Sequence, residues 1–116
     1  MENVYKGKVL NVVDGDTFDA LVELGFGVVQ KFRVRLLGVD TPEKNTEEGV
    51  RSWDAVKDLI DGKTVYLSDN GKGKYGRALA RVELSNGQDL TEWIIDHDLG
   101  KPYKGGKRRL CTIDLV

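Results

Sequence analysis

Two aspartates stand at points of the sequence where strands should begin or end. Asp16 follows an Asp14-Gly15 turn signal, and Asp40 follows a run of alternating apolar residues. In a meander of strands joined by tight turns, residues that flank the ends of neighbouring strands can converge. Two carboxylates that converge repel each other unless they share a cation, so their pairing indicates a hard-metal site. Turn or cap chemistry would explain each aspartate taken alone.

Two arginines favour a functional role for these aspartates over turn or cap chemistry. Arg35 lies five residues before Asp40, and Arg77 follows Tyr75-Gly76 at the start of a later strand. Guanidinium groups match phosphate oxygens in a forked geometry, and their charge opposes the charge that accumulates in the transition state. Glu43 could accept a proton from an attacking water or orient it. These groups beside a carboxylate-held cation are what phosphoryl chemistry requires.

The composition limits both the class of protein and the kind of metal. The 116 residues are 40% hydrophobic and 32% charged, as in one ordinary globular domain, so we expect a single domain over 1–116. The single cysteine, Cys111, excludes an internal disulfide and a cysteine-rich zinc site. The single histidine, His97, excludes a two-histidine nuclease mechanism, and we expect it to pack at the core edge. A metal should therefore be held by oxygen and be Ca²⁺ or Mg²⁺.

Charge and hydropathy limit the partners. No apolar run approaches the ~20 residues that a membrane span needs, so we expect no membrane contact. No signal peptide is visible, so the chain as it stands would be cytoplasmic, or secreted if a leader had been removed. The net charge of −1 argues against holding nucleic acid by bulk positive charge. The charges are uneven, however, because residues 101–109 hold five bases and no acids.

The apolar periodicity predicts a mainly β fold of the α+β class. Strands are expected at 4–13, 17–24, 28–37, 64–67 and 78–84, and helices at 45–61 and 90–97. The first helix should start at Asn45, paired with Glu48 as in a capping box, and should present Val50, Trp53, Val56 and Ile60 on its apolar face. Residues 68–76 should form a polar loop. Five strands with a helix between the third and fourth predict a Greek-key barrel of the OB-fold type with two helices.

Three motifs together resemble the staphylococcal (thermo)nuclease family over about Val4 to Tyr103. The motifs are Val13-Asp14-Gly15-Asp16-Thr17, Arg35-Leu36-Leu37-Gly38-Val39-Asp40-Thr41-Pro42-Glu43 and Lys74-Tyr75-Gly76-Arg77. Each motif alone is weak, but three in this order on the expected elements are specific. The resemblance implies a Ca²⁺-dependent endo/exonuclease on an OB-type barrel, with Mg²⁺ a weaker expectation. It would cut single-stranded DNA, RNA or both with little sequence preference and leave 3′-phosphates.

The resemblance also implies a role for each residue that matches the family's motifs. Asp16, Asp40 and the backbone carbonyl of Thr41 would bind the metal. Arg35 and Arg77 would bind the scissile phosphate, and Glu43 would act as general base or water-orienting group. The substrate-binding positions would be Lys74 and Tyr75, near a terminal phosphate, and Tyr103, near the family's base-stacking tyrosines.

The sequence departs from the family at two places. The segment after Glu43 is several residues shorter, which can change the placement of that acid. The family's long C-terminal helix is apparently missing, and residues 104–116 form a basic tail outside a core of about 4–103. We expect a monomer. Three alternatives stay open: a barrel that has lost catalysis and serves as a nucleic-acid or protein-binding module, a plain single-strand binder, and a structural domain.

Overall fold

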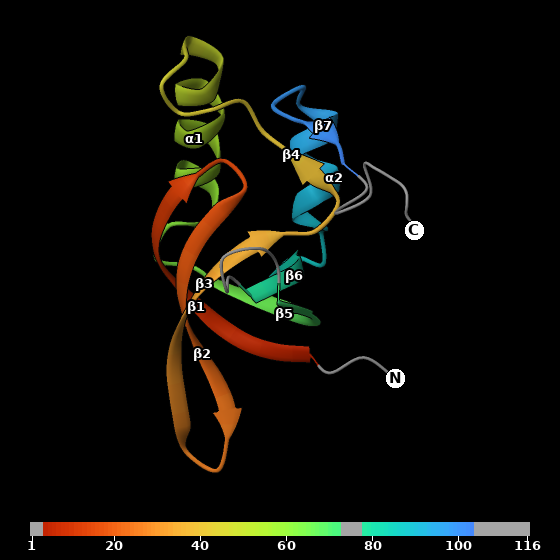
Figure 1. Cartoon of the computed structure of the whole chain (residues 1–116). Coiled ribbons are helices and arrows are strands. Elements are labelled where there is room, and N and C mark those ends of the chain that lie inside the picture. Colours follow the sequence, from red (N-terminus) through yellow and green to blue (C-terminus); the bar gives the residue numbers. More distant parts are fainter. Residues whose placement is uncertain (1–3, 73–77, 104–116) are drawn as a thin grey trace.

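Five strands close into a barrel in a computed structural model, which describes residues 4–72 and 78–103. The barrel strands are β1 (Val4–Asp14), β2 (Thr17–Gly25), β3 (Val28–Leu36), β5 (Thr64–Lys72) and β6 (Ala78–Leu84). They pair in the order β1-β2-β3-β6-β5 and close through β1 and β5, as Figure 1 shows. Only the β3–β6 pair among them is parallel. The expected mainly β, OB-type barrel with two helices is therefore confirmed.

Alternating side chains fill the barrel. Phe18, Ala20 and Val22 on β2 are buried, as is Val34 on the paired strand β3. The residues between them point outward, because successive side chains of a strand lie on opposite faces. The same alternation places the side chains of Thr17 and Arg35 on the outside of the barrel, where Thr17 is nevertheless 3% exposed.

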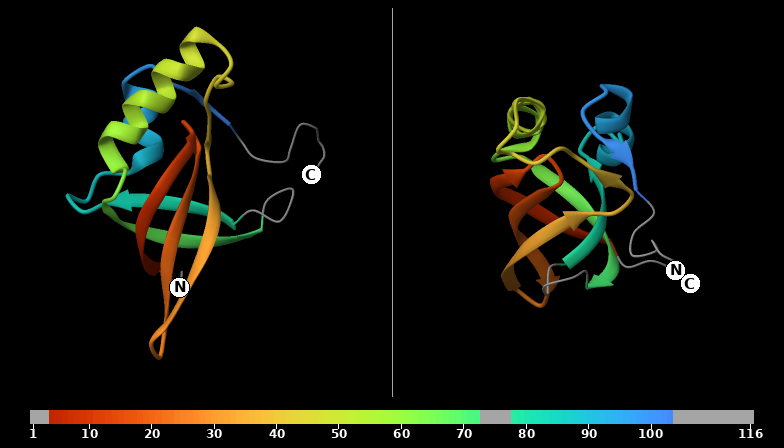
Figure 2. Two further views of the ribbon diagram at one scale, coloured as in Figure 1. Left: turned by 90° about the vertical axis from the view of Figure 1, so that its left-hand side faces the viewer. Right: turned by 45° about the horizontal axis from the view of Figure 1, so that its top comes forward.

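Two helices lie at one end of the barrel, and the β2–β3 hairpin extends from the other (Figure 1 and Figure 2). Helix α1 (Glu47–Ile60) buries Val56 and Ile60, and its Trp53 Nε1 donates a hydrogen bond to the Val12 carbonyl at 2.8 Å. Helix α2 (Leu90–Asp96) packs against β6 through buried Leu90 and Ile94. No helix among the described residues is long and apolar enough to span a membrane.

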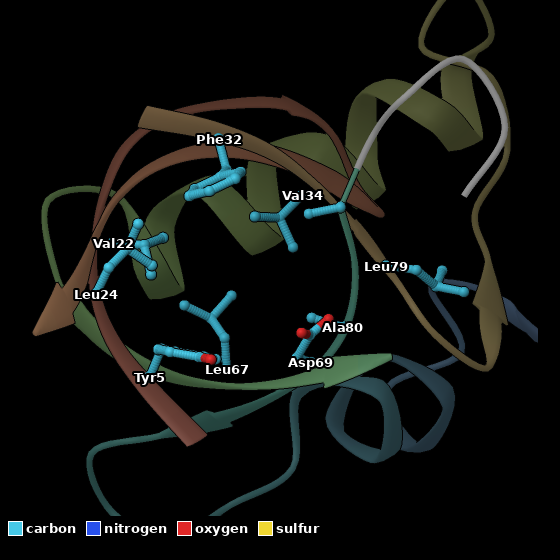
Figure 3. Close-up of a pocket in the computed structure, with 10 residues that line it drawn as sticks. Tyr5, Val22, Leu24, Phe32, Val34, Leu67, Asp69, Leu79 and Ala80 are labelled. Carbon is cyan, nitrogen blue, oxygen red and sulfur yellow. The ribbon is translucent and has the colours of Figure 1, made fainter. Parts of the chain in front are cut away.

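The hairpin end of the barrel holds an apolar cavity of about 150 Å³. Figure 3 shows Val22, Phe32, Val34 and Leu67 around it, with Tyr5 and Asp69 among its polar contributors. These residues come from the barrel half away from α1. The cavity is thus separate from the polar residues at the helix end.

The local predictions failed at several elements. Helix α1 is capped by Thr46 rather than Asn45, and Val50 is 47% exposed rather than buried. Strand β5 extends to Lys72, so part of the loop predicted at 68–76 is strand that pairs with β6. His97 is exposed and stacks on Trp93 with ring centroids 4.2 Å apart, so it does not pack into the core edge.

A short two-stranded sheet was also not predicted. It joins β4 (Val39–Asp40) to β7 (Lys101–Pro102), with Asp40 paired to Lys101. The predicted basic tail over 104–116, including Cys111 and the question of the C-terminal helix, lies outside the described residues.

Candidate functional site

The described site residues of the first two motifs line one polar cleft at the helix end of the barrel. It is formed by the β1–β2 turn, the end of β3, strand β4 and the segment that leads into α1. Its lining includes Asp16, Arg35, Asp40, Thr41 and Glu43. Four separate pieces of backbone therefore bring together the five residues that the sequence spreads from 16 to 43.

Asp16 is held in place by both its backbone and its side chain. The Leu36 N–H donates to the Asp16 carbonyl at 2.9 Å, which fixes the turn beside the end of β3. One carboxylate oxygen, Oδ1, accepts from Thr17 Oγ1 at 3.0 Å, and the other, Oδ2, accepts from the Thr41 N–H at 3.0 Å. Asp16 is 8% exposed. A nearly buried carboxylate with these two donors has a fixed orientation toward the cleft.

Two backbone carbonyls hold the Arg35 side chain in place, in addition to its contacts with Asp16 and Asp40. Its Nη1 donates to the carbonyls of Leu36 at 2.9 Å and Val39 at 2.8 Å. Its Nη2 lies 3.3 Å from Asp40 Oδ1, and Nη1 lies 3.6 Å from Asp16 Oδ2. Nε and the second Nη2 hydrogen make no hydrogen bond within the described part of the chain. Because a guanidinium has five N–H donors, the arginine keeps donors for an anion while its plane stays fixed.

Asp40 is the last residue of β4 in the short β4–β7 sheet, and Thr41 follows it directly. The Tyr103 N–H donates to the Gly38 carbonyl at 3.0 Å, which continues this pairing past Pro102. The Asp40 side chain is 62% exposed, whereas Thr41 is 8% exposed. Thr41 Oγ1 is buried and has no hydrogen-bond partner among the described residues. This hydroxyl lies against the backbone of Gly15, where an added Cβ would be 3.0 Å from Thr41 Oγ1, whereas the backbone N–H of Thr41 is the group that contacts Asp16.

Glu43 is positioned by the start of α1. Its carbonyl accepts from the Thr46 hydroxyl at 2.6 Å and from the Thr46 N–H at 3.0 Å. The same hydroxyl accepts from the Gly49 N–H at 3.0 Å, so one side chain caps the helix and holds the Glu43 backbone. A Cβ at Gly49 would lie 1.7 Å from the Glu43 carbonyl oxygen. The helix can approach this closely only because residue 49 is glycine. Glu43 is exposed and lines the cleft.

The remaining predicted residues divide into two groups. Tyr103 lies beside the site, with its ring centroid 5.9 Å from the Arg35 Cζ. Lys74, Tyr75 and Arg77 lie outside the described residues, so their place relative to the cleft stays a prediction.

The cleft also contains residues that were not selected from the sequence. The Thr17 hydroxyl donates a hydrogen bond to Asp16, and Lys44 Nζ donates to the Val13 carbonyl at 3.3 Å. Gly49 was missed as well, although a glycine inside a helix is a signal for close approach, since it costs helix stability relative to alanine.

The donor set of the cleft fits a hard cation. Asp16, Asp40 and the backbone of Thr41 offer oxygen atoms only, and no nitrogen or sulfur ligand lies in the cleft lining. Among the described residues no group of three or more His, Cys, Asp or Glu side chains is arranged to hold a metal. The protein would therefore supply only part of a coordination shell, and water or substrate would supply the rest, as Ca²⁺ and Mg²⁺ sites allow.

Comparison with known proteins found one family model and several relatives. A family model described as Staphylococcal nuclease homologue matches residues 33–109. An uncharacterized endonuclease of Escherichia coli O157:H7 is 33% identical over 89 residues, which are 77% of this chain and 55% of that protein. A micrococcal nuclease of Shigella flexneri is 35% identical over 112 residues, covering 97% of this chain and 53% of that protein. An uncharacterized protein of Bacillus anthracis is 42% identical over 104 residues, which cover 82% of this chain and 46% of that protein. The chain spans about half the length of these relatives.

Proposed function

The chain belongs to the staphylococcal nuclease homologue family, and we propose that it hydrolyses phosphodiester bonds of nucleic acid with the help of a bound metal ion. One observation supports this most strongly. A carbonyl-fixed arginine, Arg35, lies within 3.3 Å of Asp40 and 3.6 Å of Asp16 in the cleft that Glu43 also lines. An arginine with unused donors beside paired carboxylates suits a phosphate bound next to a cation.

The carboxylates and Thr41 would hold the metal. Asp16, Asp40 and the Thr41 carbonyl are the proposed ligands, and Ca²⁺ is the proposed metal in preference to Mg²⁺. When bound, the cation would supply positive charge at the scissile phosphate. Asp16 is suited to this role because its two hydrogen bonds set its orientation before any ligand arrives. Asp40, which is far more exposed, would adjust to the bound group.

Arg35 would bind a non-bridging oxygen of the scissile phosphate. Its contacts with the Leu36 and Val39 carbonyls stay in place when a phosphate arrives, so little reorganisation is needed during the reaction. We assign Arg77 the second contact with the scissile phosphate. Glu43 would take a proton from the attacking water or orient that water in line with the leaving oxygen.

The finer features of the activity are part of the same proposal. The substrate would be single-stranded DNA, RNA or both, cut with little sequence preference to leave a 3′-phosphate. Lys74 and Tyr75 would contact a neighbouring phosphate, and Tyr103 would lie beside the bound nucleotide through its position next to Arg35. The active species would be a monomer.

The test is hydrolysis of a fluorescently labelled single-stranded DNA, and of its RNA counterpart, with Ca²⁺, with Mg²⁺ and with chelator. Wild-type protein should cleave with Ca²⁺ and stop with chelator. Arg35→Ala and Glu43→Ala should each lose about 10²–10³ in rate, the cost of removing one transition-state contact, while their melting curves stay cooperative. If the protein binds the oligonucleotide but does not cleave it under any of the metal conditions, it is a nucleic-acid-binding module and this proposal is wrong.

A further inference from the structure

The outer surface of strands β1 to β3 has a regular arrangement of charges below the cleft. Two cross-strand rows lie on it, Asn11–Asp19–Arg33 and Lys8–Leu21–Lys31, and these six residues define the outer β1–β3 face. The next row toward the cleft pairs Thr17 with Arg35. All of these residues alternate with the buried Phe18, Ala20 and Val34, so they point away from the core.

This face has a positive surplus. Arg33 donates from Nε and Nη2 to the two oxygens of Asp19, at 2.9 and 3.2 Å, which neutralises the one acid of the face. The Arg33 side chain nevertheless stays 53% exposed. Lys8 and Lys31 are exposed and form no ion pair with any described residue. Leu21 lies between these lysines and is 37% exposed. Two unpaired lysines around an exposed leucine suit a ligand that has both negative charge and an apolar surface.

The β2–β3 hairpin continues this face to an unusual tip. Phe26 is fully exposed between Gly25 and Gly27, and its φ of 54° lies in the left-handed region that bulky residues avoid. Figure 2 shows the hairpin extending beyond the barrel. Glu23 is the single acid in residues 20–32. A fully exposed ring buries no surface within the described fold, and a strained backbone position of this kind is often found at binding sites.

We propose that a single-stranded nucleic acid lies along the outer β1–β3 face, with phosphates at Lys8, Lys31 and Arg33 and a base stacked on Phe26. This rests on the proposed function, because the face begins at Arg35 in the reaction cleft. Charge and position both favour this ligand. The basic residues follow strand β3 away from the cleft at every second position, 35, 33 and 31. Basic grooves with exposed aromatics are the usual means of holding single strands without sequence preference.

Binding and cleavage are measured separately to test this. Fluorescein-labelled dT20 is titrated with the full chain in chelator at several salt concentrations, so that no cleavage occurs. Lys8→Gln/Lys31→Gln removes two charges from the face, and Phe26→Asn removes the ring but suits a positive φ. The controls are Lys57→Gln and Val50→Asn, which change an exposed lysine and an exposed valine on α1.

The double variant should make the dependence of log affinity on log salt shallower by ~1.4, twice the ~0.7 expected for each phosphate contact of a single strand. Phe26→Asn should weaken dT20 binding by about fivefold or more, the effect of losing one stacked base, and should melt no lower than wild type. Both controls should bind as wild type does.

Three results would overturn the proposal. If wild type cleaves and binds dT20 but the face variants match the controls, this face is not the binding surface and the proposed function stands. If wild type neither binds nor cleaves, the proposed function fails and this inference fails with it. If Phe26→Asn keeps dT20 affinity but loses binding to vesicles of phosphatidylcholine and phosphatidylserine, the tip serves a lipid surface instead.

Discussion

Replacing Gly49 with alanine gives the sharpest test of how Glu43 is positioned. Alanine normally stabilises a helix interior by about 1 kcal/mol relative to glycine. Here the new Cβ would lie 1.7 Å from the Glu43 oxygen and 2.3 Å from its carbonyl carbon. Real Cβ atoms come no closer than about 3.0 Å to such an atom. The new Cβ and the Glu43 oxygen must therefore move apart by roughly 1.3 Å, the difference between 3.0 and 1.7. The start of α1 and the Glu43 backbone must therefore move apart.

The stability cost of this movement should be small and its catalytic cost large. Keeping the contact under strain costs about 1–3 kcal/mol. Releasing it instead breaks the two Thr46 hydrogen bonds to the Glu43 carbonyl, at about 0.5–1.5 kcal/mol each. After subtracting the helix gain, we expect roughly 0–2 kcal/mol of destabilisation. A catalytic group displaced by about 1 Å, however, can cost on the order of 10²-fold in rate.

The assay compares kcat for Ca²⁺-dependent cleavage of labelled DNA with the melting temperature of each variant. Gly62→Ala is the matched control, because its Cβ would meet open space but its φ of 74° disfavours alanine, by about 1–2 kcal/mol. Both variants should lose some stability, but only Gly49→Ala should lose activity. If Gly49→Ala keeps wild-type kcat, or if Gly62→Ala loses as much, then the helix contact does not position Glu43 for catalysis.

Four further outcomes follow from particular contacts. Arg35→Lys keeps the positive charge, but a lysine cannot donate to the Leu36 and Val39 carbonyls and to a phosphate at the same time. The rate of cleavage should therefore fall by about 10²-fold or more. A near-normal rate would show that a point charge at this position is sufficient. Saturating Ca²⁺ at about 100 times its Kd should stabilise wild type by about 2.7 kcal/mol in thermal melts, and Asp40→Asn should lose most of that shift if Asp40 is a ligand. The hydrogen bond from Arg33 lowers the pKa of Asp19 below its ordinary 3.8. Ionised Asp19 therefore stabilises the fold above pH 3.8, and this contribution is lost as the pH falls through the lowered pKa. In urea unfolding at a series of acid pH values, Asp19→Asn should make the free energy of unfolding depend less steeply on pH. Phe18→Ala should cost about 3–5 kcal/mol in urea unfolding because Phe18 is 1% exposed in the barrel core, and a loss under 1 kcal/mol would contradict that packing.

The sequence was sufficient for the barrel because its signals are local. The Asp14-Gly15 turn and the alternation of β2 place Thr17 opposite Arg35, so they also bring Asp16 beside the end of β3. The rest of the fold depends on contacts between distant residues. Residues 68–72 are polar and turn-like, yet this segment is strand because Ser68, Asp69 and Lys72 pair with β6. The two-residue strand Lys101–Pro102 has no local signal at all and is fixed by β4.

The start of α1 shows why one part of the site could not be predicted. Asn45 and Thr46 are both good N-cap residues, so local propensity does not choose between them. Thr46 is the cap because its hydroxyl can accept from Gly49 while donating to the Glu43 carbonyl. That second bond depends on the connection after Glu43 being short. This short connection therefore places the backbone of Glu43 directly on the helix cap.

The two halves of the site consequently depend on different structural supports. Asp16 and Arg35 are held by barrel pairing and by carbonyls at the end of β3, whereas Glu43 depends on the helix cap. Helix ends open more readily than central strands. A change confined to the cap should therefore lower kcat with little effect on KM, because Arg35 would still bind phosphate. If Thr46→Ala raised KM and left kcat unchanged, the helix cap would instead be supporting substrate binding, and Glu43 would be better assigned to that step.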